Sequence, residues 1–275
     1  MLEDILKQIV IENKQKKVTN DVILNYLKEY VQCLVLNLLY NHRDFQKLVF
    51  KGGSCLRVCF NLPRLSEDLD FDYSQKQFNG KMLTALSGYL NKEIKNKHFS
   101  SVELKDQSNS RLYLKFPILR KLEIASRSES DKLYVKIETS EKIEPCANFT
   151  LTPVSKFGFN FIAYHYDLPS MMSGKINAIL SRLWFKGKQQ EIDIKGRDYY
   201  DLYWFFKNKV VPNWKMLKKL TKIKTEKALK AILKDKINKA ITGQKLNYDL
   251  RNFIADQEFV DNFSRNYPEI MKKYL

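Results

Sequence analysis

Residues 68–72, Asp-Leu-Asp-Phe-Asp, alternate acidic and apolar side chains without a break. Successive side chains of an extended strand point to opposite faces, so the three aspartates share one face and the two apolar residues share the other. A helix would scatter both sets around its axis. The segment therefore predicts a strand with one apolar and one acidic face, and with it a sheet.

The acidic face of this strand suits a hard cation. Carboxylates so close together repel one another unless a positive charge lies between them, and oxygen ligands on a rigid strand suit Mg²⁺. A strand face that is simply solvated would give the same pattern. Asp68, Asp70 and Asp72 alone therefore do not decide between a metal site and an exposed face.

A glycine pair, Gly52-Gly53, lies upstream of the acidic strand and follows the short apolar run 47–50. Glycine lets the backbone come close to a ligand, and its N–H group can face an anion. Ser54 is expected to cap a brief helix, whose N-terminus attracts phosphate. The segment lacks both Gly-Lys-Ser/Thr and GxGxxG, so it is neither a Walker A loop nor a dinucleotide fingerprint. A plain turn is the alternative.

The periodicity of apolar residues predicts an α+β fold. Helical spacing occupies residues 1–47 and 80–97, and strands are expected at 47–50, 68–73, 102–104, 111–116, 133–139, 151–154 and 159–166. Later helices are expected at 170–184, 197–209, 213–220, 225–241 and 258–273. The change near residue 168 predicts two domains: residues 1–168 with a small mixed sheet, and an all-helical domain over 169–275.

The charge balance favours an anionic partner. The chain has 48 Lys and Arg against 31 Asp and Glu, a net charge of +17. Such an excess suits nucleic acid or a nucleotide, although a lysine-rich surface in a compositionally biased protein would look the same. The C-terminal lysines that could meet an RNA backbone are Lys215, Lys218, Lys219, Lys222, Lys224, Lys227 and Lys230.

The cysteines form no CxxC pair, and the three histidines lie far apart in the sequence. We therefore expect reduced thiols in a cytoplasmic protein and no zinc site. The N-terminus lacks the pattern of a signal peptide, and no run approaches the roughly 18 apolar residues of a membrane span. A membrane location is not expected.

Four segments occur in an order typical of one family: FKGGSCLR, RLSEDLDF, KINAILSR and KGRDYYDLYWF. Together they resemble the AbiEii/AbiGii nucleotidyltransferase toxins, members of the DNA polymerase β-like nucleotidyltransferase superfamily. The resemblance covers about residues 48 to 206. It implies a polymerase β-like core and a helical C-terminal region that completes the active site.

The resemblance also implies roles for single residues. Gly52, Gly53 and Ser54 would contact the phosphates of an NTP, and Asp68 and Asp70 would hold Mg²⁺, with two ions expected. Glu138 in LYVKIETS is the candidate third carboxylate, and Asp72 remains the alternative. Arg64 and Ser66 would brace the metal-binding strand.

Further roles fall on the C-terminal region. Lys175 would reach the triphosphate together with Arg182, and Asp198 would act as a catalytic acid or base or orient the substrate. Lys175 and Arg182 share one helical face at i and i+7, with the small Ala178 between them. A solvated basic face is the alternative. Asp201 near the start of the next helix is expected to be structural, since acids there suit the helix dipole.

The implied activity is Mg²⁺-dependent transfer of a nucleotide from an NTP to an acceptor (EC 2.7.7), with tRNA as the expected acceptor, by the toxin of a toxin–antitoxin or phage-defence pair. A cognate antitoxin protein would be its partner. Two other readings stay open. The same fold could modify a protein or small molecule, or it could serve as a non-catalytic nucleotide or nucleic-acid binding module.

Overall fold

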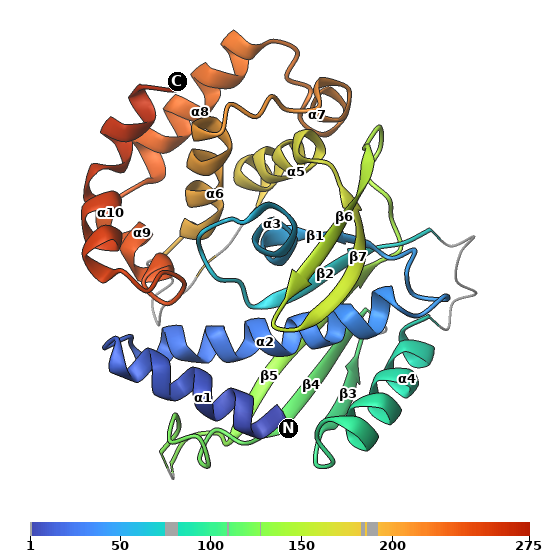
Figure 1. Cartoon of the computed structure of the whole chain (residues 1–275). Coiled ribbons are helices and arrows are strands. Elements are labelled where there is room, and N and C mark those ends of the chain that lie inside the picture. Colours follow the sequence, from blue (N-terminus) through green and yellow to red (C-terminus); the bar gives the residue numbers. More distant parts are fainter. Residues whose placement is uncertain (1, 75–81, 109, 127, 183–184, 186–191) are drawn as a thin grey trace. The chain divides into compact units, whose positions relative to one another are not determined.

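The computed structural model describes residues 2–74, 82–108, 110–126, 128–182, 185 and 192–275. The predicted helix ends at residues 80–81 and 183–184 lie outside this part of the chain. The chain divides into two compact units, Met1–Ile143 with Phe149–His165, and Glu144–Asn148 with Tyr166–Leu275. The first holds the sheet and the second is helical, which confirms the predicted α+β class (Figure 1).

The sheet of the first unit is mixed and has seven strands in the order β3-β4-β5-β2-β1-β7-β6. Its strands are β1 (Val49–Lys51), β2 (Asp68–Asp72), β3 (Glu103–Gln107), β4 (Arg111–Pro117), β5 (Lys132–Ser140), β6 (Phe149–Lys156) and β7 (Phe159–Tyr166). The acidic strand β2 is central, because it pairs antiparallel with β1 and parallel with β5. Leu69 and Phe71 are fully buried, as the alternation predicts.

Four helices accompany the sheet: α1 (Leu2–Gln15), α2 (Asn20–Tyr40), α3 (Gly52–Phe60) and α4 (Met82–Lys97). Helix α2 packs against α1 and β5 (Figure 1) and is buried on nearly every side. By length and composition alone α2 could cross a membrane, but 72% of its most apolar stretch is buried in the structure, as in the core helix of a soluble protein. The length and composition of α2 are therefore weak evidence for a membrane span.

A buried carboxylate joins three elements of the first unit. Glu29 on α2 accepts from Arg57 Nε on α3 at 2.6 Å and from Lys156 Nζ on β6 at 2.5 Å. Burial favours the neutral acid, but the two cations outweigh it and lower the pKa of Glu29. The charged triad therefore fastens α3 and β6 to the central helix.

The second unit consists of α5 (Leu168–Ser181), α6 (Gly196–Lys207), α7 (Trp214–Thr221), α8 (Glu226–Ala240), α9 (Gly243–Leu250) and α10 (Gln257–Lys272). Aromatic side chains of α6 form much of its core: Tyr199, Tyr200 and Phe205 are buried. The hydroxyl of Tyr267 on α10 donates to the Tyr199 carbonyl at 2.9 Å. These rings pack inside the protein and are not free to stack on bases. Helix α9 is not among the predicted elements.

Candidate active site

The glycine pair forms the junction between β1 and α3. Gly52 has a φ of +78°, and a Cβ built there would lie 2.3 Å from Oδ2 of Asp70. A Cβ on Gly53 would lie 2.7 Å from the guanidinium of Arg64 and 2.8 Å from Oγ of Ser66. A side chain at Gly52 would strain the backbone and displace the Asp70 carboxylate, and one at Gly53 would displace Arg64 or Ser66. Arg64 and Ser66 are buried beside the turn, and their bracing role stays a prediction.

The prediction that Ser54 caps helix α3 is wrong. The helix starts at Gly52, two residues earlier than expected, with Lys51 as its N-cap. Gly52 can start the helix there because its positive φ lets the chain turn sharply out of β1. Ser54 therefore lies inside the first turn, and its hydroxyl donates to the carbonyl oxygen of Asp68. Ser54 thus fastens the turn to the acidic strand.

The acidic face of β2 meets charged residues of both neighbouring strands. In register, Asp70 lies opposite Lys51 of β1 and Glu138 of β5, and Asp68 lies opposite Lys136 of β5. Directly paired residues present their side chains on the same face. The structure thus places Asp68, Asp70 and Glu138, which the resemblance implies as metal ligands, on one face of the sheet.

A single lysine lies between two of these acids. Nζ of Lys136 is 3.0 Å from Oδ2 of Asp68 and 3.1 Å from Oε1 of Glu138. Arg111 approaches the same Glu138 oxygen at 2.8 Å. Burial raises the pKa of Asp68 despite Lys136, whereas Lys136 and Arg111 together outweigh burial and lower the pKa of Glu138. Two carboxylates therefore already converge on one cation.

Asp72 has different surroundings from Asp68 and Asp70. Its side chain is fully buried, and its Oδ1 lies 2.5 Å from Nζ of Lys51. Asp68, by contrast, keeps about a third of its side chain exposed. A cavity of about 210 Å³ opens at this part of the sheet and is lined by Lys51, Asp70, Arg111 and Glu138, among others. Asp70 and Glu138 thus line the cavity, whereas Asp72 forms a buried ion pair with Lys51.

The donor set at this face suits a hard divalent cation. The three acids offer carboxylate oxygens from two adjacent strands, and Gly52 leaves room for the Asp70 carboxylate against the backbone. Mg²⁺ prefers one or two such carboxylates and completes its coordination with water and substrate phosphate. Asp68, Asp70 and Glu138 would hold Mg²⁺ here, and Lys136 would have to leave its present position between two of them.

The second unit contains its own charged cluster, built on α5 and α6. Lys175 Nζ lies 2.7 Å from Asp198 Oδ1 and 2.8 Å from Asp201 Oδ2, and Arg182 lies 2.7 Å from Asp198 Oδ2. Burial favours the neutral acid, but Lys175, Arg182 and Lys195 lower the pKa of Asp198 to about 2. Asp198 is therefore a permanently charged anchor for two cations, and a poor proton acceptor at neutral pH.

A small cavity adjoins this cluster. Its volume is about 30 Å³, and Ala178, Arg182, Lys195 and Asp198 are among the residues that line it. Burial and the nearby Arg197 lower the pKa of Lys195. Lys175 is not among the residues that line this cavity, so the expectation that Ala178 leaves space for a ligand between Lys175 and Arg182 stays a prediction. The carboxylates of Asp198 and Asp201, however, already pair with these cations and offset part of their positive charge.

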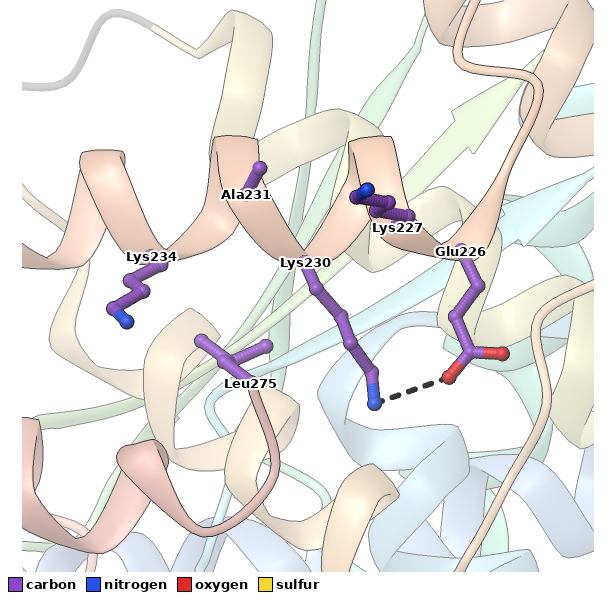
Figure 2. A pocket seen from close by; sticks show the side chains of 6 residues that line it. All are labelled: Glu226, Lys227, Lys230, Ala231, Lys234 and Leu275. Atoms are coloured by element: carbon purple, nitrogen blue, oxygen red, sulfur yellow. Dashed lines mark ion pairs between the residues drawn. The ribbon is translucent and has the colours of Figure 1, made fainter.

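A row of lysines marks one face of α8. Figure 2 shows Lys227, Lys230 and Lys234 around a shallow hollow that Leu275 also lines. Lys230 pairs with Glu226 at 3.1 Å, whereas Lys227 and Lys234 are exposed. The adjacent stripe of α8, Leu229, Leu233 and Ile237, is buried. The spacing at i, i+3 and i+7 therefore gives one basic surface.

Several cations of the site were not predicted from the sequence. Lys51, Arg111 and Lys136 face the acids of the sheet, and Lys195 lies beside Asp198. Lys136 and Glu138 are two residues apart in a predicted strand, so their shared face could have been inferred. Arg111 could not, because its position depends on the pairing of β4 with β5.

Distance along the sequence does not keep the cysteines and histidines apart in the structure. Cys55 and Cys59 of α3 meet His165 of β7, and their ligand atoms all lie within 4.8 Å of one another. Among the described residues, this is the only group of three or more His, Cys, Asp or Glu side chains found so close together. His165 is distant in sequence and reaches the cysteines because β7 pairs with β1, directly before α3.

The sequence matches one family model, and the fold is similar to solved structures. Residues 35–275 match the family described as nucleotidyl transferase AbiEii toxin, type IV TA system. A crystal structure described as a candidate nucleotidyltransferase from H. pylori is similar at 21% identity and a TM-score of 0.47, covering 90% of this chain and 94% of that one. JHP933 from Helicobacter pylori is similar at 21% identity and a TM-score of 0.46, with coverages of 91% and 93%. No curated protein matches the sequence.

Proposed function

Because this chain belongs to the AbiEii family of nucleotidyltransferase toxins of type IV toxin–antitoxin systems, we propose that it transfers a nucleotide from an NTP to tRNA in a Mg²⁺-dependent reaction. The observation that carries the proposal is the convergence of Asp68 and Glu138 on one ammonium group, beside Asp70 and the Gly52 turn. A divalent cation needs such a convergence of oxygen donors.

In the proposed reaction, a hydroxyl oxygen of the acceptor attacks the α-phosphorus of the NTP. The bond between the α-phosphorus and the bridging oxygen breaks, and pyrophosphate leaves. Bound Mg²⁺ would acidify the attacking hydroxyl and neutralise charge on the leaving group. The backbone N–H groups at Gly52 and Gly53 are suited to hold phosphate oxygens, since neither residue carries a side chain of its own.

We assign the acceptance of the hydroxyl proton to Asp70, directly or through water, because Asp70 lines the cavity. Lys175 and Arg182 remain our candidates for binding the triphosphate. For Asp198 we favour orienting these two cations over proton transfer, since both contact its carboxylate and its pKa is about 2. Its alternative role as a catalytic acid or base would need a much higher pKa.

For the acceptor we propose RNA, and we place its backbone on the lysine row of α8. The three lysines and the net charge of +17 favour a polyanion over a small molecule. A cytoplasmic location would supply NTP, Mg²⁺ and tRNA, and it agrees with four cysteines that are all free. A cognate antitoxin would be the partner that restrains the enzyme.

The test is transfer of label from each α-labelled NTP, with Mg²⁺ and total RNA, followed by separation of RNA from protein. We expect label on tRNA with the wild-type chain, and a loss of roughly 100-fold or more in Asp70→Asn, because one charged metal ligand is removed. Asp106→Asn is the matched control, since Asp106 is an exposed acid on β3. Label on protein would replace the RNA reading, and full activity in folded Asp70→Asn would exclude the metal assignment.

Expression without an antitoxin gives a second readout. We expect the wild-type chain to slow growth and the double variant Asp68→Ala, Asp70→Ala to restore it. Growth arrest that persists in the double variant would show that toxicity does not depend on the acidic face of β2.

A further inference from the structure

Cys55, Cys59 and His165 form a compact group of soft ligands. The two cysteines are four residues apart on α3, so both side chains lie on one face of the helix. His165 faces them from β7, and the ligand atoms of all three lie within 4.8 Å of one another. Small side-chain movements would bring one sulfur–nitrogen triangle around a metal ion, whose bonds to sulfur and nitrogen measure about 2.0 to 2.3 Å.

The imidazole of His165 is held in one orientation. Its Nε2 lies 2.8 Å from Oγ1 of Thr152 on β6, and this contact restrains the ring. With Nε2 on Thr152, Nδ1 would be the metal ligand. Metal-binding histidines usually have such a partner on their other ring nitrogen, because it fixes the ring and its tautomer.

The surroundings also suit a divalent ion bound by two thiolates. Cys55 and His165 are fully buried, and an isolated charge among them would be costly. The charges of two thiolates, one neutral imidazole and a divalent cation sum to zero, so the occupied site would carry no net charge. A bound metal would deprotonate both thiols.

We propose that Cys55, Cys59 and His165 bind a zinc ion, at a site separate from the carboxylates of the acidic strand. Two thiolates and an imidazole are the ligands that zinc prefers, and the set contains no carboxylate that would favour Mg²⁺. Cys59 is only half-buried, so the ion can enter past it and keep a solvent ligand at a fourth position. The ion would tie α3 to β7.

The experiment uses the full chain, purified with a thiol reductant and freed of metal, and titrated with Co²⁺ as a spectroscopic substitute for Zn²⁺. We expect thiolate-to-cobalt charge transfer in the near ultraviolet, saturation at about one equivalent and displacement by Zn²⁺. Cobalt bound at the carboxylates would give no thiolate band, which separates the two sites.

Cys59→Ser should abolish the thiolate band, whereas Cys146→Ser should keep it, because Cys146 is exposed and lies outside the group. Wild-type protein without the band, or folded Cys59→Ser with it, would overturn the proposal. A second measurement uses only the wild-type chain, so its result does not depend on whether a variant folds. Zn²⁺ should protect Cys59 from alkylation, mapped by mass spectrometry, and leave Cys146 reactive. Equal alkylation of Cys59 with and without Zn²⁺ would also overturn the proposal.

Discussion

Lys136 carries one charge and faces two carboxylates, and this position makes it a competitor of any metal at the acidic face. Its ammonium lies about 3 Å from both Asp68 and Glu138. Burial favours the neutral amine, but the two acids outweigh it and raise the pKa of Lys136, so the competing charge is present at every physiological pH. A cation that enters between the acids must first displace it.

Replacing Lys136 by methionine should therefore tighten metal binding. We expect Lys136→Met to raise the affinity for Mn²⁺, used as a probe for Mg²⁺, by roughly tenfold, or about 1.4 kcal/mol. The substitution removes the competing charge and keeps a side chain of similar length. The measurement is a Mn²⁺ titration followed by electron paramagnetic resonance, which does not depend on activity.

Lys132→Met is the matched control for this substitution. Lys132 is on the same strand and pairs with Glu103 at 2.6 Å, away from the acidic face of β2. We expect its Mn²⁺ affinity to equal that of the wild type. If Lys136→Met binds Mn²⁺ no better than Lys132→Met, the lysine does not compete for the site.

At the scale of elements, Asp198 joins the end of α5 to the start of α6. It lies in the first turn of α6, and its partners Lys175 and Arg182 lie on α5 and at the C-cap of α5. Asp198 is only 3% exposed, so its charge is stabilised by these cations and not by water. The pairing therefore makes stability depend on pH in a defined direction.

We expect Asp198→Asn to destabilise the protein by about 2 kcal/mol at pH 7, since its pKa falls from an ordinary 3.8 to about 2 on folding. A lowered folded pKa means that this contribution is complete above about pH 5 and is lost as the pH falls toward 2. The difference between wild type and variant should therefore shrink between pH 5 and pH 3.

Urea unfolding followed by tryptophan fluorescence measures this difference, because Trp204 and Trp214 lie in the same unit as Asp198. Asp235→Asn is the control: Asp235 is exposed and pairs with Lys239 only at the surface of α8. Such a pair contributes little, so we expect almost no change there. A pH-independent effect of Asp198→Asn would contradict the charge argument.

For the molecule as a whole, the net charge of +17 attracts polyanions over long distances. The lysine row of α8 would be the place where the RNA backbone binds. Binding to RNA releases counterions, so each phosphate contact adds to the salt dependence. A general attraction spread over the surface would be nearly insensitive to the loss of any three lysines.

We expect the triple variant Lys227→Ala, Lys230→Ala, Lys234→Ala to weaken tRNA binding and to reduce the log–log salt slope by about 2, at roughly 0.7 to 0.9 per contact. Filter retention of labelled tRNA between about 50 and 200 mM salt measures the slope. The control Lys92→Ala, Lys95→Ala, Lys97→Ala removes equal charge from α4 and likewise includes one lysine paired with a glutamate four residues earlier. Equal slopes in the two variants would argue against the α8 surface.

The sequence predicts elements with a strong period well and long-range contacts poorly. The alternation at residues 68–72 is sufficient to predict β2, because it reports burial on one face. The start of α3 was placed two residues too late, since nothing local reveals that Gly52 adopts a positive φ. His165 meets Cys55 and Cys59 only through the pairing of β7 with β1, which no spacing along the chain encodes.

The charged triad of Glu29, Arg57 and Lys156 has a consequence for local opening. If β6 moves away from the core, Lys156 leaves a carboxylate that is 2% exposed, and separating a buried pair costs roughly 3–5 kcal/mol. The same carboxylate holds Arg57 of α3, the helix that begins at the glycine pair. The outer hairpin β6–β7 and this helix should therefore fluctuate as one cooperative unit, and their amide hydrogens should exchange together. Local opening of the edge strand β6 would then also loosen the turn proposed to bind phosphate.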